Sequence, residues 1–560
     1  MASSDIEPRR LHPALSWAVL FAGLVVVHIS LLRLPYFWDE AGYYVPAARD
    51  LLLTGSLIPH STPSNAHPPL VMAYLALCWK IAGYAPVVTR VAMLAVAAFS
   101  LLGVFRLARR VANLEVAFAA TLCTALYPVF FVQSSLAQVD LAAAGLTFWA
   151  LLAYVEGRRG ATAIWFSLAV LAKETAILAP LALLLWESSP GILPAIRKAT
   201  RPGRREEDAD AEESRGKGAT SAERFLRSLV LLCPAVPLTL WYAYHRLRTG
   251  FVFGNLEFFR YNVQATMHPL RILLALLMRL WQVTGYMNLY PLTLAALFAM
   301  WLPPIYDQGA AKTEPRSRIA PDIQFAFAAV IAAYMLAMAA IGGAVLARYM
   351  LPVVPLVIII CASTVWRRVP MWPGMVSIAA LAFVAALFIN PPYGFSLEDN
   401  LAYRDYIELH QRAEKFLLAR YPVAAVLTSW PASGELSQPW IGYVERPVRV
   451  VQIENFTLEE LMSAAELRSS FEVALVFSTK YDPPHPLLER WRSWQRIKTE
   501  FFGYHRDLPP AAAARLLGGH LVYTDFRQGQ WVSVIEMEQI RDAQTVAPPS
   551  AGPLPYPLSR

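Results

Sequence analysis

Long apolar runs recur in this chain from Ala14 to about Asn390, and they constrain its fold more than any other feature. About twenty consecutive apolar residues in a helix are enough to cross the hydrocarbon core of a bilayer. Hydrophobic residues make up 56% of the chain and charged residues only 16%, against roughly 25% charged in soluble domains. The sequence therefore predicts a polytopic α-helical membrane protein, located in a cell membrane and, we expect, in a bacterial inner membrane.

The apolar runs predict about eleven spans. Ala73 to Gly83 is too short to span securely and is expected to lie along the outer surface, and 271–284 is a second interfacial candidate. Basic residues gather in short loops between the runs, as cytoplasmic loops do, which places the N-terminus inside and, with an odd number of spans, the C-terminus outside. The expected spans lie near residues 14–32, 86–105, 114–133, 139–156, 160–173, 175–188, 225–245, 286–303, 322–343, 349–366 and 372–391.

The same loops explain the formal net charge of +8. Because the Lys and Arg residues lie between spans and form no continuous basic surface, no nucleic-acid partner is predicted. All four cysteines lie in apolar segments, so neither a disulfide framework nor a thiolate metal site is indicated.

The chain divides by composition into a membrane module at 1–391, a soluble α/β domain at 392–545 and a Pro-rich tail at 546–560. The module contains a first outer loop at 33–85 and a charged cytoplasmic loop at 189–224. After Pro392, helix-like segments alternate with short β-branched runs, a pattern typical of α/β domains. The expected helices are about 402–420, 457–467 and 486–496, and the expected strands are Val423–Thr428, Val448–Ile453 and Val473–Phe477.

Eight polar residues are expected on the outer side of the membrane, within or beside apolar segments. Any one of them can be an ordinary interfacial charge, a local ion pair or a solvated loop residue. Ionisable groups at membrane depth are costly, however, and tend to face a shared cavity and pair with one another. The sequence thus predicts one polar site built from Asp39, Glu40, His67, Asp140, Lys173, Glu174, Arg348 and Tyr349.

Taken in order, these motifs resemble the GT-C membrane glycosyltransferases, in the branch of the protein O-mannosyltransferases (dolichyl-phosphate-mannose-protein mannosyltransferase-like) and the lipid A aminoarabinose transferase. The resemblance covers about residues 10–390. Its pieces are Trp38–Tyr44 (WDEAGYY), His67–Leu70 (HPPL), Asp140 at the start of a span, Leu171–Glu174 (LAKE) and Ala347–Pro352 (ARYMLP).

The resemblance implies transfer of a sugar from a polyprenyl-phosphate donor to an acceptor hydroxyl on the outer side of the membrane. The acceptor, whether a protein, lipid A or another lipid, or a cell-envelope glycan, stays open. Asp39 matches the family's catalytic acid and is the expected base, and Glu40 beside it is expected either to support the site from behind or to orient substrate. Arg348 has a planar fork suited to phosphate oxygens, Lys173 adds a charge and Tyr349 a hydroxyl donor.

Two questions stay open from the sequence. His67 stands where the aminoarabinose transferases carry a lysine near the lipid phosphate, so its charge and role are unsettled. No cofactor is certain, and a divalent metal, if any, would be held by Asp39, Glu40 and Asp140. The alternative function is a secondary transporter that uses Asp39, Asp140 and Lys173 for ion coupling. No internal duplication of the kind found in transporters is present, which favours the transferase.

Overall fold

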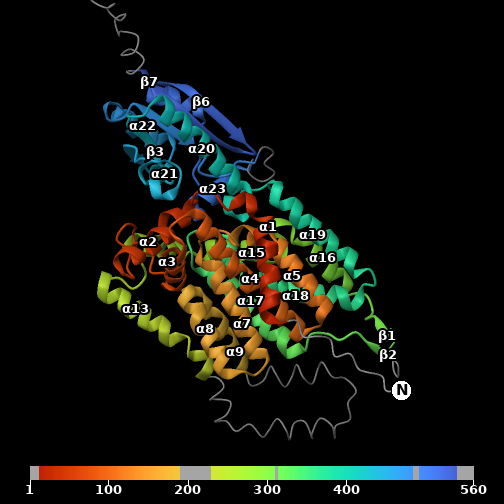
Figure 1. Cartoon of the computed structure of the whole chain (residues 1–560). Coiled ribbons are helices and arrows are strands. Elements are labelled where there is room, and N and C mark those ends of the chain that lie inside the picture. The colour runs from red at the N-terminus through yellow and green to blue at the C-terminus, as the bar shows by residue number, and fades with distance from the viewer. Residues whose placement is uncertain (1–11, 189–228, 309–312, 484–490, 539–560) are drawn as a thin grey trace, which may run out of the picture. The chain divides into compact units, whose positions relative to one another are not determined.

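The computed structural model describes residues 12–188, 229–308, 313–483 and 491–538. It divides the chain into two compact units, Met1–Tyr403 and Arg404–Arg560 (Figure 1). The predicted cytoplasmic loop at 189–224 and the tail at 546–560 lie outside the described residues. The division falls later than the predicted boundary at 391, because side chains between 392 and 403 bond to residues of the first unit.

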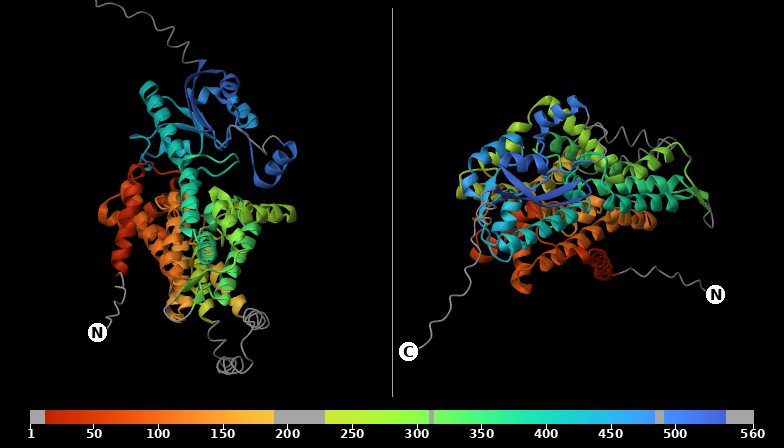
Figure 2. Two further views of the ribbon diagram at one scale, coloured as in Figure 1. Left: turned by 90° about the vertical axis from the view of Figure 1, so that its right-hand side faces the viewer. Right: turned by 90° about the horizontal axis from the view of Figure 1, so that it is seen from above.

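The described part of the first unit is helical apart from one short hairpin, β1 (Tyr306–Gln308) and β2 (Thr313–Pro315). Figure 2 shows its helices from two further directions. The longer helices are α1 (Pro13–Val27), α4 (Pro86–Val111), α5 (Leu114–Leu126), α7 (Val139–Val155), α8 (Arg159–Ala172), α13 (Ala235–Thr249), α15 (Pro269–Thr284), α17 (Pro321–Ala340), α18 (Val354–Arg368) and α19 (Trp372–Phe388). Shorter elements between them are η1 (Ile29–Leu31), η2 (Glu40–Tyr44), α2 (Val45–Thr54), α3 (Leu70–Ala82), α6 (Pro128–Gln133), η3 (Glu174–Ile177), α9 (Leu178–Glu187), α14 (Leu256–Asn262), η4 (Gln264–Thr266), η5 (Tyr286–Asn288), α16 (Tyr290–Ala299), η6 (Ala347–Met350) and η7 (Leu397–Asp399).

Within the described residues, two helices are long and apolar enough to cross a membrane, α4 and α17. A third candidate is the segment Pro269–Asn288 with α16, if this pair, bent by 102°, is counted as one span. Six further apolar helices are shorter, namely α1, α3, α5, α7, α8 and α19. The count of about eleven spans therefore stays a prediction.

Several predicted spans are not continuous helices. The segment 114–133 breaks at Tyr127, because Pro128 lacks the amide hydrogen needed to continue α5 and instead starts α6. The segment 286–303 yields an α-helix only from Tyr290, after η5, since Met287 and Asn288 take positive φ angles of 49° and 61°. Likewise 175–188 begins with η3 before α9, and 349–366 becomes helical at Val354 after η6.

α15 covers the second predicted interfacial segment, at 271–284. Its Leu273, Leu277 and Leu280 are exposed, whereas Arg271 and Arg279 are buried. Spacings of three and four residues put these leucines on one face of the helix. An apolar outer face with inward arginines fits a helix that lies against lipid, and this placement stays a prediction.

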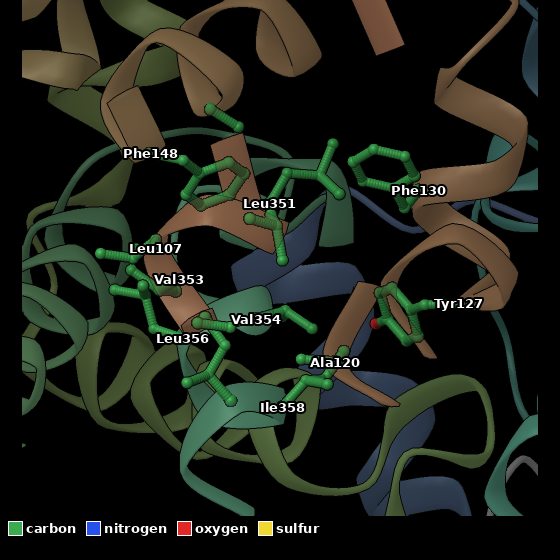
Figure 3. Packing of buried hydrophobic residues seen from close by; sticks show 14 of the residues in the cluster. Leu107, Ala120, Tyr127, Phe130, Phe148, Leu351, Val353, Val354, Leu356 and Ile358 are labelled. Atoms are coloured by element: carbon green, nitrogen blue, oxygen red, sulfur yellow. The ribbon is translucent and has the colours of Figure 1, made fainter. Parts of the chain in front are cut away.

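The core of the first unit lies where α4, α5, α7 and α18 meet (Figure 3). Leu107, Ala120, Phe148 and Ile358 contribute from these four helices. α4 and α7 approach closely, and a Cβ on Gly145 would lie 2.0 Å from Ser100 Oγ. Small residues allow such close contact between helices in lipid, where van der Waals packing drives association.

The second unit is an α/β domain around a five-stranded sheet of order β4-β3-β5-β7-β6. β4 and β5 flank β3 in parallel, while β7 pairs with β5 and β6 antiparallel. The strands are β3 (Val426–Ser429), β4 (Val450–Ile453), β5 (Val473–Phe477), β6 (Gly519–Arg527) and β7 (Gln530–Met537). The helices are α20 (Ala402–Arg420), α21 (Ala432–Ser437), η8 (Pro439–Ile441), α22 (Leu458–Glu466), η9 (Arg468–Ser470), α23 (Arg492–Phe502) and α24 (Pro510–Leu517).

The three predicted strands form as β3, β4 and β5, and the predicted helices at 402–420 and 457–467 form as α20 and α22. The helix expected at 486–496 starts later, as α23, and part of its predicted range lies outside the described residues. The β6–β7 hairpin is not among the elements predicted from the sequence. α20 packs on the sheet, where Phe416 stacks on Tyr523 with ring centroids 5.0 Å apart (Figure 1).

Candidate active site

Asp39 occupies an unusual turn of backbone. Trp38 before it has a φ of 45°, a left-handed conformation that bulky residues rarely adopt. Asp39 then leads into η2, a single π-helical turn. Both features are costly locally and are frequent at functional sites. The side chain of Asp39 keeps 22% of its surface exposed, so its carboxylate is held in place yet open to an incoming group.

Arg348, on η6, is the centre of the polar network, and its side chain is only 2% exposed. Its guanidinium binds the Asp39 carboxylate, and Nη1 lies 2.5 Å from an oxygen of Glu398. Nη1 also donates to the side-chain oxygen of Gln138 at 2.7 Å, and Nε lies 3.4 Å from Asp140 Oδ2. Three carboxylates from distant parts of the chain therefore surround one arginine, which offsets the cost of burying its charge.

Lys173 adds a second cation to this network. Its Nζ lies 2.5 Å from Asp140 Oδ1 and 4.1 Å from the centre of the Tyr349 ring. The Arg279 guanidinium approaches the same ring at 5.5 Å. Aromatic faces attract cations, so Tyr349 helps to keep three positive groups together in a buried space. Such a cluster is suited to binding an anion.

Glu40 points away from this network. Its side chain has no exposed surface and forms a two-pronged ion pair with Arg90, both distances being 2.6 Å. The backbone amides of Phe37 and Ala137 donate to its two oxygens at 2.8 and 2.7 Å. All of these bonds are internal, which favours the supporting role of Glu40 over a contact with substrate, because Glu40 anchors the turn that carries Asp39.

His67 and Glu174 form a separate pair, with Nδ1 and Oε2 2.8 Å apart. Ala66 before His67 has a positive φ of 58°, which turns the chain sharply at this point. A small, partly open pocket lies beside His67, and Tyr43 and Trp241 also line it. Glu174 follows Lys173 directly in the chain, so this pair adjoins the Arg348 network without bonding to it.

The predicted site residues thus fall into three groups. Asp39, Asp140, Lys173, Arg348 and Tyr349 lie together, His67 and Glu174 pair beside them, and Glu40 binds Arg90.

Among the three carboxylates that could hold a metal ion, Glu40 does not lie with Asp39 and Asp140. Glu40 pairs with Arg90, whereas Asp39 and Asp140 both lie at Arg348, and Asp140 also pairs with Lys173. Metal ligands must instead direct their oxygens at one shared point. We therefore place no metal ion among these three carboxylates.

Sequence reasoning missed Glu398 and Gln138, which complete the shell around Arg348. Glu398 lies on η7, in a segment assigned from the sequence to the soluble domain. The signal was the run Glu398-Asp399-Asn400, which follows an apolar helix on the predicted outer side. Asp399 is buried and accepts a hydrogen bond from Tyr286 Oη at 2.6 Å. Burial raises the pKa of Asp399 to about 7.

Comparison with known families supports the resemblance that the motifs predict. Residues 66–189 match the family described as dolichyl-phosphate-mannose-protein mannosyltransferase. The predicted resemblance to GT-C glycosyltransferases is confirmed over this segment, and with the apolar helices it supports a helical membrane protein. No curated protein sequence matches.

Solved structures of similar shape share little sequence with this chain. ArnT from Cupriavidus metallidurans bound to undecaprenyl phosphate has a TM-score of 0.47 at 12% identity, over 92% of this chain and 98% of that one. An oligosaccharyltransferase from Archaeoglobus fulgidus has a TM-score of 0.43 at 13% identity, over 92% and 72%. The arabinofuranosyltransferase AftD from Mycobacteria has a TM-score of 0.43 at 12% identity, over 93% and 40%.

Proposed function

We propose that this chain is an integral-membrane glycosyltransferase that moves a sugar from a polyprenyl-phosphate donor to an acceptor hydroxyl on the extracytoplasmic side. The observation that carries the proposal is the contact between the partly exposed Asp39 carboxylate and the buried Arg348 guanidinium. A base and an anion-binding cation side by side are what this transfer requires. The family match at 66–189 supports the same class of reaction.

The chemistry balances with these groups alone. The acceptor hydroxyl loses its proton to Asp39 as its oxygen forms a bond to the anomeric carbon of the sugar. The bond from that carbon to the phosphate oxygen breaks, and its electron pair leaves with the polyprenyl phosphate. Arg348 and Lys173 stabilise the negative charge that develops on this phosphate. No general acid is needed, because the leaving group is already an anion.

The pairing of Arg348 suggests how the donor enters. Among its carboxylate partners, Asp39 is 22% exposed, whereas Asp140 and Glu398 are 2% and 4% exposed. A donor phosphate would therefore replace Asp39 on the guanidinium most easily. Displacement frees the Asp39 carboxylate at the moment when the sugar arrives. Arg348 would thus hold the base inactive until the donor binds.

The side of the membrane on which the site lies is taken from the sequence prediction. We propose a multi-pass protein of the bacterial inner membrane, with the first outer loop and the second unit outside. His67, beside the small pocket that Tyr43 and Trp241 also line, would contact donor or acceptor there. Glu174 would fix the orientation of the His67 ring through the contact between them.

The test is Asp39→Asn in purified full-length protein. The donor class is identified first, from the lipid-linked sugar that accumulates when the gene is deleted. Turnover of that donor should fall by about 10²-fold or more in the Asn variant, because general bases contribute about 10²–10⁴-fold. Glu257→Gln is the matched control, since Glu257 is an exposed carboxylate outside the network, and should keep full turnover.

Two results would count against the proposal. An Asn variant with more than about a tenth of wild-type turnover would remove Asp39 as the base. A wild type that turns over no polyprenyl-phosphate sugar, while ion flux depends on Asp39, Asp140 and Lys173, would favour the transporter.

A further inference from the structure

The second unit contains a buried cluster of three ionisable side chains that the transfer reaction does not use. His410 and Glu414 lie on α20, four residues apart and therefore on one face of the helix. Glu435 reaches them from α21 (Figure 1 labels both helices). One potential ligand atom from each of the three lies within 4.8 Å of the others, and each residue is 1% exposed.

The cluster leaves polar atoms without partners. His410 Nδ1 lies 2.6 Å from Glu435 Oε2, but His410 Nε2 and Glu435 Oε1 have no hydrogen-bond partner among the described residues. Both oxygens of Glu414 also lack one. Burying a carboxylate without a partner is expensive, and native structures rarely leave such atoms unsatisfied. Burial and the neighbouring Glu435 raise the pKa of Glu414 well above its usual range.

Aromatic rings close the cluster off from water. The ring of Tyr406 stacks on His410 with centroids 3.9 Å apart, and Phe477 on β5 meets His410 edge-on at 4.7 Å. In this apolar setting two carboxylates need either protons or a cation.

We propose that His410, Glu414 and Glu435 bind one divalent transition-metal ion, with Zn²⁺ the best fit. One imidazole and two carboxylates form a mixed nitrogen and oxygen set, which suits Zn²⁺ and its neighbours. Mg²⁺ and Ca²⁺ prefer oxygen ligands alone. Two positive charges neutralise the two carboxylates, and the ion gives each carboxylate a partner. The site would tie α20 to α21 within the second unit, independently of the proposed transferase chemistry.

The experiment uses tag-free full-length protein, stripped with a chelator, dialysed and offered one equivalent of Zn²⁺. Metal content is measured by elemental analysis and affinity by calorimetry, and Mg²⁺ is the negative control. We expect about one Zn²⁺ per chain in the wild type and a rise in Tm on loading, because metal binding stabilises the folded state. Glu414→Gln and Glu435→Gln should each lose Zn²⁺ affinity by at least about 10²-fold.

Two controls locate the bound ion. His520→Gln changes an exposed histidine of the same unit, 3.6 Å from Glu538, and should leave Zn²⁺ content unchanged. Asp39→Asn alters the first unit and should also leave it unchanged, so failure of the transferase proposal would not affect this result.

Three outcomes would overturn the metal site. One is a stripped wild type that takes up less than about a tenth of an equivalent of Zn²⁺. Another is full Zn²⁺ retention by both Gln variants. The third is a Glu414→Gln variant that is as stable without metal as the wild type is with it, which would assign the cluster to a proton shared between Glu414 and Glu435.

Discussion

Glu40→Gln should destabilise the protein even though it changes a single atom. In the wild type, both Glu40 oxygens accept a guanidinium hydrogen bond from Arg90, whose side chain is 1% exposed. The amide of Gln has only one acceptor oxygen and no charge. Its nitrogen would face an N–H group of Arg90 or the backbone amide of Phe37 or Ala137, and all of these are donors.

The structure sets the size of this effect. Removing one partner of a buried ion pair costs about 3–5 kcal/mol, because the other charge stays buried without compensation. Arg90 keeps bonds to the carbonyls of Ser135 and Pro35 at 3.0 and 2.8 Å, so we expect the lower half of that range. A loss of about 3 kcal/mol lowers the folded-to-unfolded ratio by roughly 10²-fold.

The assay is equilibrium unfolding in mixed micelles, with thermal melting as a second measurement. Glu115→Gln is the control, since Glu115 is exposed in the first turn of α5, and should change stability by less than about 0.5 kcal/mol. Adding Arg90→Met to Glu40→Gln should recover part of the loss, with a coupling energy of about 0.5–3 kcal/mol. A Glu40→Gln loss below about 1 kcal/mol, or purely additive effects, would refute the anchoring role.

Three further predictions concern the donor, pH and topology. Arg348→Lys keeps the charge but loses the fork, so the donor KM should rise by about 10-fold or more with little change for the acceptor; unchanged donor kinetics would remove Arg348 from the site. Burial raises the pKa of Asp399 to about 7, from the roughly 3.9 expected in the unfolded chain. The folded state therefore holds this proton more tightly, and the stability that the protonated Asp399 contributes should be lost as pH rises from about 4 to about 7. Asp399→Asn should abolish this pH dependence of stability. In a cysteine-free background, membrane-impermeant reagents should label Ser463→Cys from outside and Asp210→Cys only from inside; labelling of both from one side would contradict the proposed topology.

The regular helices and strands could be predicted from the sequence because each follows a recognisable pattern of apolar residues. β5 coincides with the predicted Val473–Phe477, a continuous apolar run that is buried along its whole length. Helix breaks were harder to predict. Hydropathy averages over residues such as Met287 and Asn288, whose positive φ angles separate α15 from α16 and depend on tertiary contacts. The β6–β7 hairpin was missed because its alternation is weak, with β6 mostly half-exposed.

The residues that belong to the site could be predicted from the sequence better than the contacts between them. Charges next to apolar segments indicated Asp39, Asp140, Lys173 and Arg348, since burial of such residues needs a reason. Which carboxylate meets which cation depends on side-chain direction, and sequence spacing does not reveal it. Adjacent residues in a helix point to different sides, so Asp39 meets Arg348 while Glu40 turns inward.

Glu398 belongs to the charge balance around Arg348 as much as the predicted residues do. Arg348, Lys173 and Arg279 bring three positive charges into a buried space, and Asp39, Asp140 and Glu398 bring three negative ones. A donor phosphate adds negative charge to this balanced set, so at least one carboxylate must leave Arg348 or take up a proton. In the proposed transfer, Asp39 loses its negative charge by taking up the acceptor proton while the departing phosphate gains one, so the net charge of the site does not change. On the same proposal, release of the polyprenyl phosphate would return Asp39 to Arg348, which would couple loss of that proton to product release.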